Sequence, residues 1–267
     1  MRENMTVYLT MIRAAVLTRL EYRADFIVGI LGVFILNIGT LATSWVLLSR
    51  FQNLHGWGFW EIIFLYNLWL LGHGIRAIFF RHINMLEQFI VEGTFDQLLT
   101  RPANPLVQFL GREVHYLGIG DCLLAGTMLV LAYQNLSIDW SWWMFPWLIV
   151  VALSSAVVEM AITLILATTS FFTTRSSALM MAASQFSWGV VQQYPVDMFG
   201  KVLRTIVTIA LPFAFMNYYP ALLFLGKEDQ VPWGFLTWYS PIVAALLLFL
   251  AIRFWNFSIQ RYQSSGS

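Results

Sequence analysis

The sequence MLEQFIVEGTFDQLLTRPANPL occupies residues 85–106 and is a polar, acidic interruption between long apolar segments. Apolar residues recur at helical spacing from Ile83 to Ile90, after which Gly93 is expected to end the helix. A second short apolar ridge follows and ends at Arg101-Pro102. The stretch therefore predicts short amphipathic structure outside the membrane in a chain that is otherwise nearly all membrane.

The composition of the whole chain is that of a membrane protein. Of its 267 residues, 59% are hydrophobic and 11% are charged, whereas a soluble domain carries about 25% charged residues. The 12 Trp and 22 Phe residues suit a protein anchored at lipid interfaces. A net charge of +1 argues against nucleic-acid binding. The single cysteine, Cys122, excludes an intramolecular disulfide and a cysteine-based metal cluster.

Six apolar segments are each long enough to cross about 30 Å of hydrocarbon as a helix. The first follows a basic segment and is too long for the apolar region of a signal peptide, so we expect a permanent anchor and no cleaved leader. The predicted spans are 26–48, 59–80, 114–133, 146–171, 177–195 and 236–256.

Residues 199–226 form a further apolar segment, which Pro212 and Pro220 interrupt. Because proline removes a helical hydrogen bond, we expect a re-entrant hairpin that dips in from the outer side, not a seventh span. With six spans and a cytoplasmic N-terminus, eleven of the fifteen Lys and Arg residues lie inside, in keeping with the positive-inside rule. Both termini are therefore expected in the cytoplasm.

The chain is predicted to be a single transmembrane domain over 1–267, since no soluble segment is large enough to fold alone. Residues 1–25 are expected to form an interfacial helix with its arginines on one face, the alternative being a solvated basic tail. The polar loop covers 81–113. The predicted fold class is an all-α integral membrane protein: an N-terminal interfacial helix, six transmembrane helices, a cytoplasmic coupling helix after the second span, and an outer re-entrant hairpin, 199–226, before the last.

Motifs for catalysis are absent from the sequence. It has no G-x-x-x-x-G-K-[ST] phosphate loop, no H-E-x-x-H pair and no G-x-S-x-G elbow. We therefore expect no catalytic residue, no metal and no cofactor held by this chain. Any ATP that drives it would be hydrolysed by a partner.

Polar residues inside the predicted spans are the candidates for a substrate path. Glu159 lies near the middle of its span, and is either a transport or coupling residue or a structural acid bonded to a neighbouring helix. Asp121 lies nearer the cytoplasmic end and is expected to be structural, paired with Arg112 or Arg76. The other candidates, for which interhelical hydrogen bonding is the alternative, are Asn67, His73, Gln185 and Gln192.

Two segments resemble those of ABC-2 type permeases, the membrane halves of ABC transporters whose ATPase is a separate chain. The sequence GTFDQLLTRPANP, residues 93–105, is similar to the cytoplasmic loop of that family. The sequence LPFAFMNYYPA, residues 211–221, is similar to the hairpin of its subgroup of six-helix subunits. The order of basic helix, spans, loop and hairpin resembles that subgroup over nearly the whole chain.

The resemblance implies how such a chain works. Two permeases, identical or homologous, pack in the inner (cytoplasmic) membrane, and each receives one ATPase, which binds the ATP and Mg²⁺. The substrate passes between the permeases, usually outward. Residues 83–106, in the loop after the second span, would dock the ATPase and transmit its closure, whereas an amphipathic helix could otherwise simply lie on lipid. The implied docking residues are Leu86, Phe89, Ile90, Gly93, Phe95, Asp96, Leu98, Leu99 and Arg101.

A stand-alone secondary transporter, driven by protons through Glu159 or Asp121, is the alternative function. The sequence has no evident inverted repeat of the kind common in such folds. A membrane-embedded enzyme is a third possibility, which no catalytic cluster supports.

Overall fold

The computed structural model describes residues 23–51, 56–112, 114–136, 138, 140–173, 175–231 and 233–262. All but the last residues of the predicted interfacial helix, 1–25, lie outside these parts of the chain. Where the structure is described, the chain is helical and forms no strand. The predicted all-α class is confirmed.

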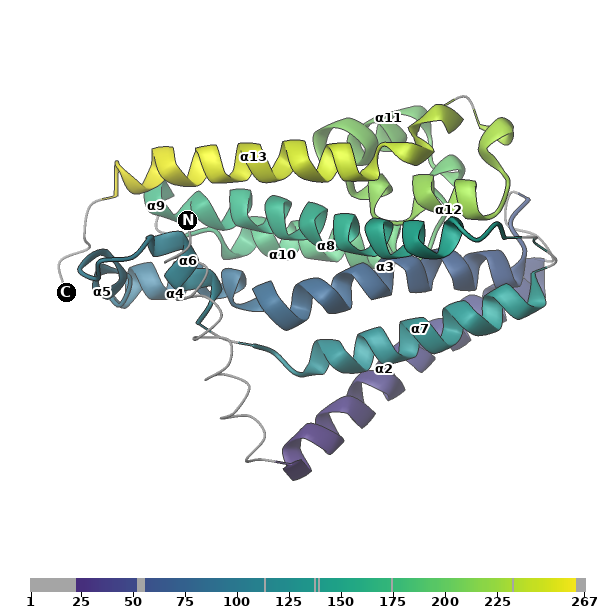
Figure 1. The fold of residues 1–267 in the computed structure, drawn as a ribbon, viewed down its shortest axis with the longest axis horizontal. Coiled ribbons are helices and arrows are strands. Elements are labelled where there is room, and N and C mark those ends of the chain that lie inside the picture. The colour runs from purple at the N-terminus through teal and green to yellow at the C-terminus, as the bar shows by residue number, and fades with distance from the viewer. Residues whose placement is uncertain are drawn as a thin grey trace.

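Five long helices form a row. They are α2 (Arg23–Phe51), α3 (Phe59–Phe80), α7 (Leu117–Asn135), α8 (Met144–Thr168) and α13 (Ser240–Ile259). Along the row α13 packs on α8, α8 on α3, α3 on α7, and α7 on α2 (Figure 1). The central helix α3 is buried along nearly its whole length, whereas α13 exposes about half of its apolar side chains. The bounds of α3 are those predicted for the second span.

Glycines let the central helices approach closely. A Cβ atom on Gly118 of α7 would lie 2.5 Å from the carbonyl oxygen of Gly74 on α3. On the other side of α3, a Cβ atom on Gly72 would lie 2.1 Å from Oγ of Ser155 on α8. Small residues at helix contacts allow the backbone-to-backbone packing that holds helices together in lipid. The row therefore depends on these positions having no side chain.

Among the described residues, four helical segments contain a stretch long and apolar enough to cross a membrane. A fifth qualifies if the bent pair Lys201–Ala210 and Phe213–Phe224 counts as one span, and a shorter apolar segment, Ile27–Thr43, lies within α2. The predicted fifth span, 177–195, is a shorter helix, α10 (Ser177–Phe186), followed by the π-helical turn η2 (Ser187–Val191). Six crossings therefore remain a prediction. The four segments are Phe59–Val91, which continues past α3 into the polar loop, Leu117–Asn135, Met144–Thr173 and Ser240–Ile259.

The hairpin bends by 75° where it was predicted to break. Its first limb is α11 (Lys201–Thr205) continued by the π-helical turn η4 (Ile206–Ala210), and its second is η5 (Phe213–Phe215) and α12 (Tyr218–Phe224). Pro212 lies at the bend, but Pro220 lies in the first turn of α12, where a missing N–H removes no helical hydrogen bond. Pro220 was therefore wrongly predicted to interrupt the segment. Asn217 fixes the bend by donating to the carbonyl oxygen of Val191 at 2.9 Å.

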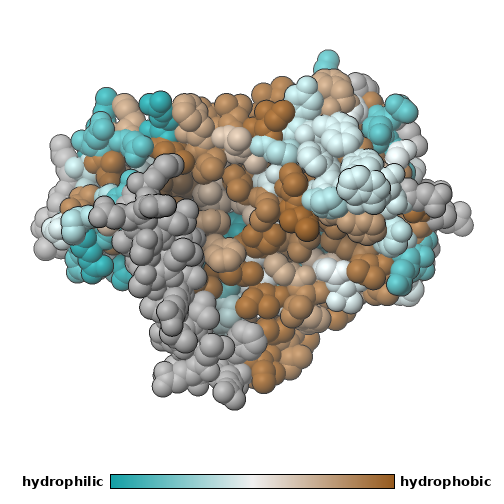
Figure 2. Space-filling view, in the orientation of Figure 1, coloured by the Kyte–Doolittle hydropathy of each residue, from teal (hydrophilic) through white to brown (hydrophobic). Residues whose placement is uncertain are grey.

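The short helices gather at opposite ends of the row (Figure 1). At one end lie η1 (Arg81–Met85), α4 (Leu86–Val91), α5 (Asp96–Leu99), α6 (Pro105–Leu110) and α9 (Ser170–Thr173). The hairpin lies at the other end, and the remaining short turns are η3 (Val196–Met198), η6 (Glu228–Gln230) and η7 (Gly234–Trp238). Figure 2 shows apolar side chains across the middle of the molecule and hydrophilic ones at both ends, as expected of a protein that crosses a membrane.

Candidate functional site

Glycine, asparagine and proline residues set where the short helices of the 81–112 loop begin and end. Helix α4 is capped at Glu92, and Gly93 then takes a φ of +68°, a left-handed conformation that favours glycine. Asn104 caps α6, because its Oδ1 accepts the backbone N–H of Leu106 at 2.9 Å, and Pro105 occupies the first turn. The predicted end of the first helix at Gly93 is confirmed.

The apolar ridge of the loop is packed inside this chain. Phe95 is fully buried, with its ring centroid 5.1 Å from that of Phe171 on α9 and 6.0 Å from that of Trp255 on α13. Leu98 belongs to the same cluster and is 3% exposed. The prediction that Phe95 and Leu98 face a partner is therefore wrong, because α9 and α13 already cover them. Leu86 and Ile90, also predicted to dock, are buried in this cluster as well.

Another side of the loop is open. Leu99 is 43% exposed, and two apolar residues that were not predicted to dock, Met85 and Val91, are 43% and 56% exposed. Arg101 is exposed beside them in sequence. Of the remaining predicted docking residues, Phe89, Gly93 and Asp96 are half-buried. Only part of the predicted docking set is thus available to another molecule.

Glu87 on α4 joins the loop to the start of α10. Its carboxylate accepts the backbone N–H groups of Ser176 and Ser177 and the hydroxyl of Ser177. A helix N-terminus has backbone N–H groups without helical partners and a partial positive charge, so a carboxylate is stabilised there. Partial burial disfavours the charge on Glu87, but these hydrogen bonds outweigh it and lower its pKa below the ordinary value. From the sequence, Glu87 was expected only to lie on the polar side of an amphipathic helix, with no capping role.

A second group of polar residues lies within the row of helices. His73 on α3 and Glu159 on α8 are 7% and 6% exposed, and Nδ1 of His73 lies 2.9 Å from Oε1 of Glu159. Both residues were predicted as candidates, and the structure brings them together across the contact between α3 and α8. A buried carboxylate needs a partner to offset its loss of water. For Glu159 this partner is His73.

Two indole rings enclose His73. Trp69, one turn earlier on α3, stacks on the imidazole with ring centroids 4.7 Å apart, and Trp188 lies edge-on to it at 5.0 Å. Trp69 also donates from Nε1 to Oγ of Ser187 at 3.1 Å. Ser187 and Trp188 belong to η2, and π-helical turns are often found at functional sites. Trp188 is 49% exposed, so the polar pair is separated from the surface by this ring on that side.

Arg76 connects the buried pair with the loop. Its Nη2 donates to Oδ1 of Asn84 in η1 at 2.8 Å and lies 3.4 Å from Oγ1 of Thr163. The hydroxyl of Thr163 in turn donates to the backbone oxygen of Glu159 at 2.7 Å. A chain of hydrogen bonds thus extends from α8 to the loop. Arg76 was not predicted as a site residue, although a buried arginine inside a predicted span was the available signal.

The other predicted path residues lie apart from this pair. Asn67 is fully buried and donates to the backbone oxygen of Ile63 on its own helix at 2.7 Å. Gln192 is buried, and Gln185 is exposed. In the described residues, no hydrogen bond links any of them to His73 or Glu159.

Asp121 is held by an amide, not by an arginine. Nδ2 of Asn37 on α2 donates to Oδ1 of Asp121 on α7 at 3.1 Å, and Oδ1 of Asn37 accepts the hydroxyl of Tyr66 on α3 at 2.7 Å. The predicted pairing with Arg112 or Arg76 is therefore wrong. The network joins three helices, which agrees with the structural role expected of Asp121.

A metal site is not evident in the described parts of the chain. No three His, Cys, Asp or Glu side chains there lie close enough together to hold a metal ion.

The comparison with protein families gives one match. Residues 34–266 match the model of the ABC-2 family transporter protein. Neither the curated proteins nor the solved structures gave a match. The matched range contains the 81–112 loop, the His73–Glu159 pair and the hairpin. The chain, with its several apolar helices, therefore belongs to the ABC-2 family of membrane transporter proteins.

Proposed function

We propose that this chain is the permease subunit of an ATP-driven exporter and that a separate ATPase docks on its 81–112 loop. The observation that supports this most directly is the two-sided packing of the loop. Phe95 anchors it among α9 and α13, while Val91 and Leu99 are exposed on its surface. Because a packed cluster transmits displacement with little compression, a force on the exposed side would reach both helices.

Two polar links would carry the same displacement further. Glu87 ties α4 to the N-terminus of α10, and Arg76 ties Asn84 of η1 to Thr163 of α8. The loop is therefore attached to the helices behind it by different kinds of contact. An ATPase that closes on its partner would move these attachments together.

The proposal includes an orientation and further partners. The loop and both termini lie in the cytoplasm, the chain crosses the inner membrane six times, and the hairpin dips in from the outer side. The location of the hairpin at the end of the row opposite the loop supports this orientation (Figure 1). A second permease, identical or homologous, would complete the path, and two ATPases with their ATP and Mg²⁺ would drive it.

The test is to purify the tagged full chain from its native membrane in a mild detergent. We expect a separate chain in the preparation that is photolabelled by an azido analogue of ATP, together with vanadate-sensitive ATP hydrolysis. Removing that chain with high salt should remove the hydrolysis and leave the permease unlabelled. ATP hydrolysis by the permease alone, or full transport without any ATPase, would refute the proposal.

The buried pair favours one other function. A histidine and a carboxylate in contact inside the row of helices are the kind of polar groups that proton pathways use, as a proton-coupled secondary transporter requires. In liposomes that hold the chain alone, this alternative requires proton flux that the substitution Glu159→Gln abolishes. A permease that depends on an ATPase should show no such flux.

A further inference from the structure

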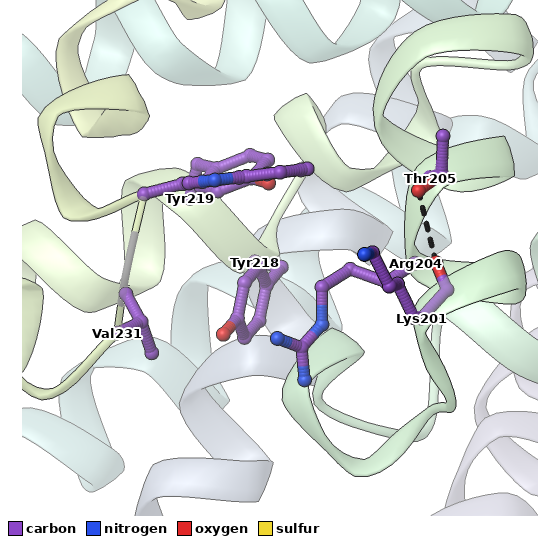
Figure 3. Close-up of a pocket in the computed structure, with 7 residues that line it drawn as sticks. Lys201, Arg204, Thr205, Tyr218, Tyr219 and Val231 are labelled. Atoms are coloured by element: carbon purple, nitrogen blue, oxygen red, sulfur yellow. Dashed lines mark hydrogen bonds between the residues drawn. The ribbon is translucent and has the colours of Figure 1, made fainter.

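The hairpin lies at the end of the molecule opposite the loop (Figure 1). It lines an open cavity of about 290 Å³ (Figure 3). Its wall comes from the first limb of the hairpin, from α12 and from the segment before η7. The lining residues are Lys201, Arg204, Thr205, Tyr218, Tyr219, Val231 and Trp233. No residue of this cavity belongs to the loop or to the His73–Glu159 pair.

The charged groups of the cavity are both cationic. Nη2 of Arg204 donates to the backbone oxygen of Asp197 at 2.8 Å, which fixes the guanidinium, while its Nε has no hydrogen-bond partner. Figure 3 shows the guanidinium extending toward the phenol of Tyr218. Within the part of the chain that the structure describes, neither Lys201 nor Arg204 forms an ion pair with a carboxylate. The acid nearest in sequence, Asp197, accepts from Nε1 of Trp57 at 3.1 Å through its carboxylate.

The first limb of the hairpin presents two different faces. Lys201, Arg204 and Thr205 share the face that lines the cavity. A neighbouring face carries Val202, Ile206 and Ile209, at helical spacing and 75%, 37% and 69% exposed. A cationic cavity thus borders an exposed apolar strip on one helix. An anionic amphiphile has this combination of headgroup and chain.

Aromatic residues place the cavity at the level of lipid headgroups. Trp233 lines it and is 37% exposed, and the following segment exposes Phe235, Trp238 and Tyr239 by 64%, 45% and 42%. Tryptophan and tyrosine concentrate at the interface between hydrocarbon and water, where one edge of the ring is wet. Two cationic side chains at such an interface attract an acidic headgroup, because opposite charges attract strongly where water is partly excluded.

We propose that this cavity binds the phosphate or carboxylate headgroup of an anionic amphiphile, whose chain lies along Val202, Ile206 and Ile209. Lys201 and Arg204 neutralise the headgroup, and the hydroxyl of Tyr218 supplies a further donor. A cavity near the lower limit of about 300 Å³ for small-molecule sites accepts a headgroup and leaves the chain outside. The inference needs only that the chain crosses a membrane, so it does not depend on the proposed ATPase.

The test uses the full chain in a neutral detergent and measures binding of dihexanoyl phosphatidylglycerol by native mass spectrometry. Replacing Lys201 and Arg204 together with Gln should weaken binding about 25-fold, since each basic residue near a headgroup contributes about 1 kcal/mol, or about fivefold, to the attraction. Lys201→Gln alone alters an exposed side chain, so it should fold normally and still weaken binding about fivefold. Arg253→Gln, an exposed arginine outside the cavity, is the matched control and should bind like the wild type.

Several comparisons can overturn the proposal. Equal binding of dihexanoyl phosphatidylcholine would show that the headgroup charge is not recognised. Displacement of the lipid by inorganic phosphate at the same concentration would assign the cavity to a free anion, not to an amphiphile. If Arg253→Gln lost as much lipid binding as Lys201→Gln, the lipid would be held by the general positive charge of the protein surface and not by this cavity. Unchanged binding in Lys201→Gln and in the double variant would refute the site itself.

Discussion

The carboxylate of Glu87 accepts the backbone N–H of Ser176, although the two residues are 89 positions apart in the chain. The contact closes the N-terminus of α10 with a residue that α4 supplies. The cap position itself, Ser176, makes no side-chain capping hydrogen bond. The start of α10 therefore depends on the position of the loop.

Replacing Glu87 with Ala should loosen the first turn of α10. Loss of a capping acceptor costs about 0.5–2 kcal/mol, so hydrogen exchange of the amides of Ser176 and Ser177 should accelerate about fivefold. Glu87→Gln keeps an acceptor and should have a smaller effect. Glu92→Ala is the control, because Glu92 bonds only to Gln88 on its own helix. Unchanged exchange in Glu87→Ala, measured by mass spectrometry, would contradict the capping role.

The same contact should respond to acid. The folded-state pKa of Glu87 is lowered from its ordinary value of 4.5, so its contribution to stability is fully present above that pH. It should be lost as the pH falls through the lowered value, when the carboxylate takes up a proton. We expect protection of the amides of Ser176 and Ser177, corrected for intrinsic exchange, to decline below pH 4.5. Protection in Glu87→Gln should not show this decline.

Two glycines of α7 provide a matched pair of substitutions. Gly118→Ala places a Cβ atom 2.5 Å from the backbone oxygen of Gly74, so α3 and α7 must separate. Overpacking of this kind costs about 1–3 kcal/mol. Gly126→Ala meets nothing within 4 Å, and Ala is the better helix former by about 1 kcal/mol. Thermal unfolding in detergent should therefore show a lower midpoint for the first variant and an equal or higher one for the second. Equal shifts would mean that the helices do not depend on this approach.

Hydropathy alone was sufficient to predict much of the fold. The second span was predicted over 59–80, which are the bounds of α3. A long apolar segment with few charges is rarely anything other than a membrane-spanning helix. The breaks at Gly93 and Pro212 follow from backbone chemistry that each residue carries with it. The neighbours of each helix could not be predicted, because lipid-facing and helix-facing surfaces have similar apolar composition. The burial of Phe95 shows this, since its cover comes from α9 and α13, far along the chain.

The polar site was only partly predictable for the same reason. Glu159 and His73 stood out because charged or polar groups are costly in hydrocarbon, but their pairing depends on α3 and α8 being neighbours. Asp121 was assigned an arginine partner, and the structure gives it Asn37 from α2. Glu87 was the least predictable, since a carboxylate on an amphipathic helix is ordinarily solvated.

The His73–Glu159 pair should be measurable as a coupling energy. Replacing either residue with Ala leaves the other buried without its partner, at a cost of about 1–3 kcal/mol for the group left behind. Replacing both should cost less than the sum, with a coupling of about 0.5–3 kcal/mol in a double-mutant cycle. Glu159→Gln keeps the shape and an acceptor, so we expect an assembled complex with altered transport or altered ATPase stimulation. If the two substitutions have additive effects on stability and Glu159→Gln transports like the wild type, the pair neither stabilises the fold nor takes part in transport.

The exposed and buried residues of the loop should separate docking from folding. Val91→Asp with Leu99→Asp alters exposed side chains, so the permease should retain its thermal stability but lose the ATPase on co-purification. Each large apolar side chain buried at an interface contributes about 1.5–3 kcal/mol, so two such changes are enough to release a partner held at micromolar affinity. Leu98→Asp is the contrasting variant: it places a charge in the cluster around Phe95 and should unfold the loop itself. If the exposed pair of substitutions retains the ATPase at matched expression, this surface of the loop is not where the ATPase docks.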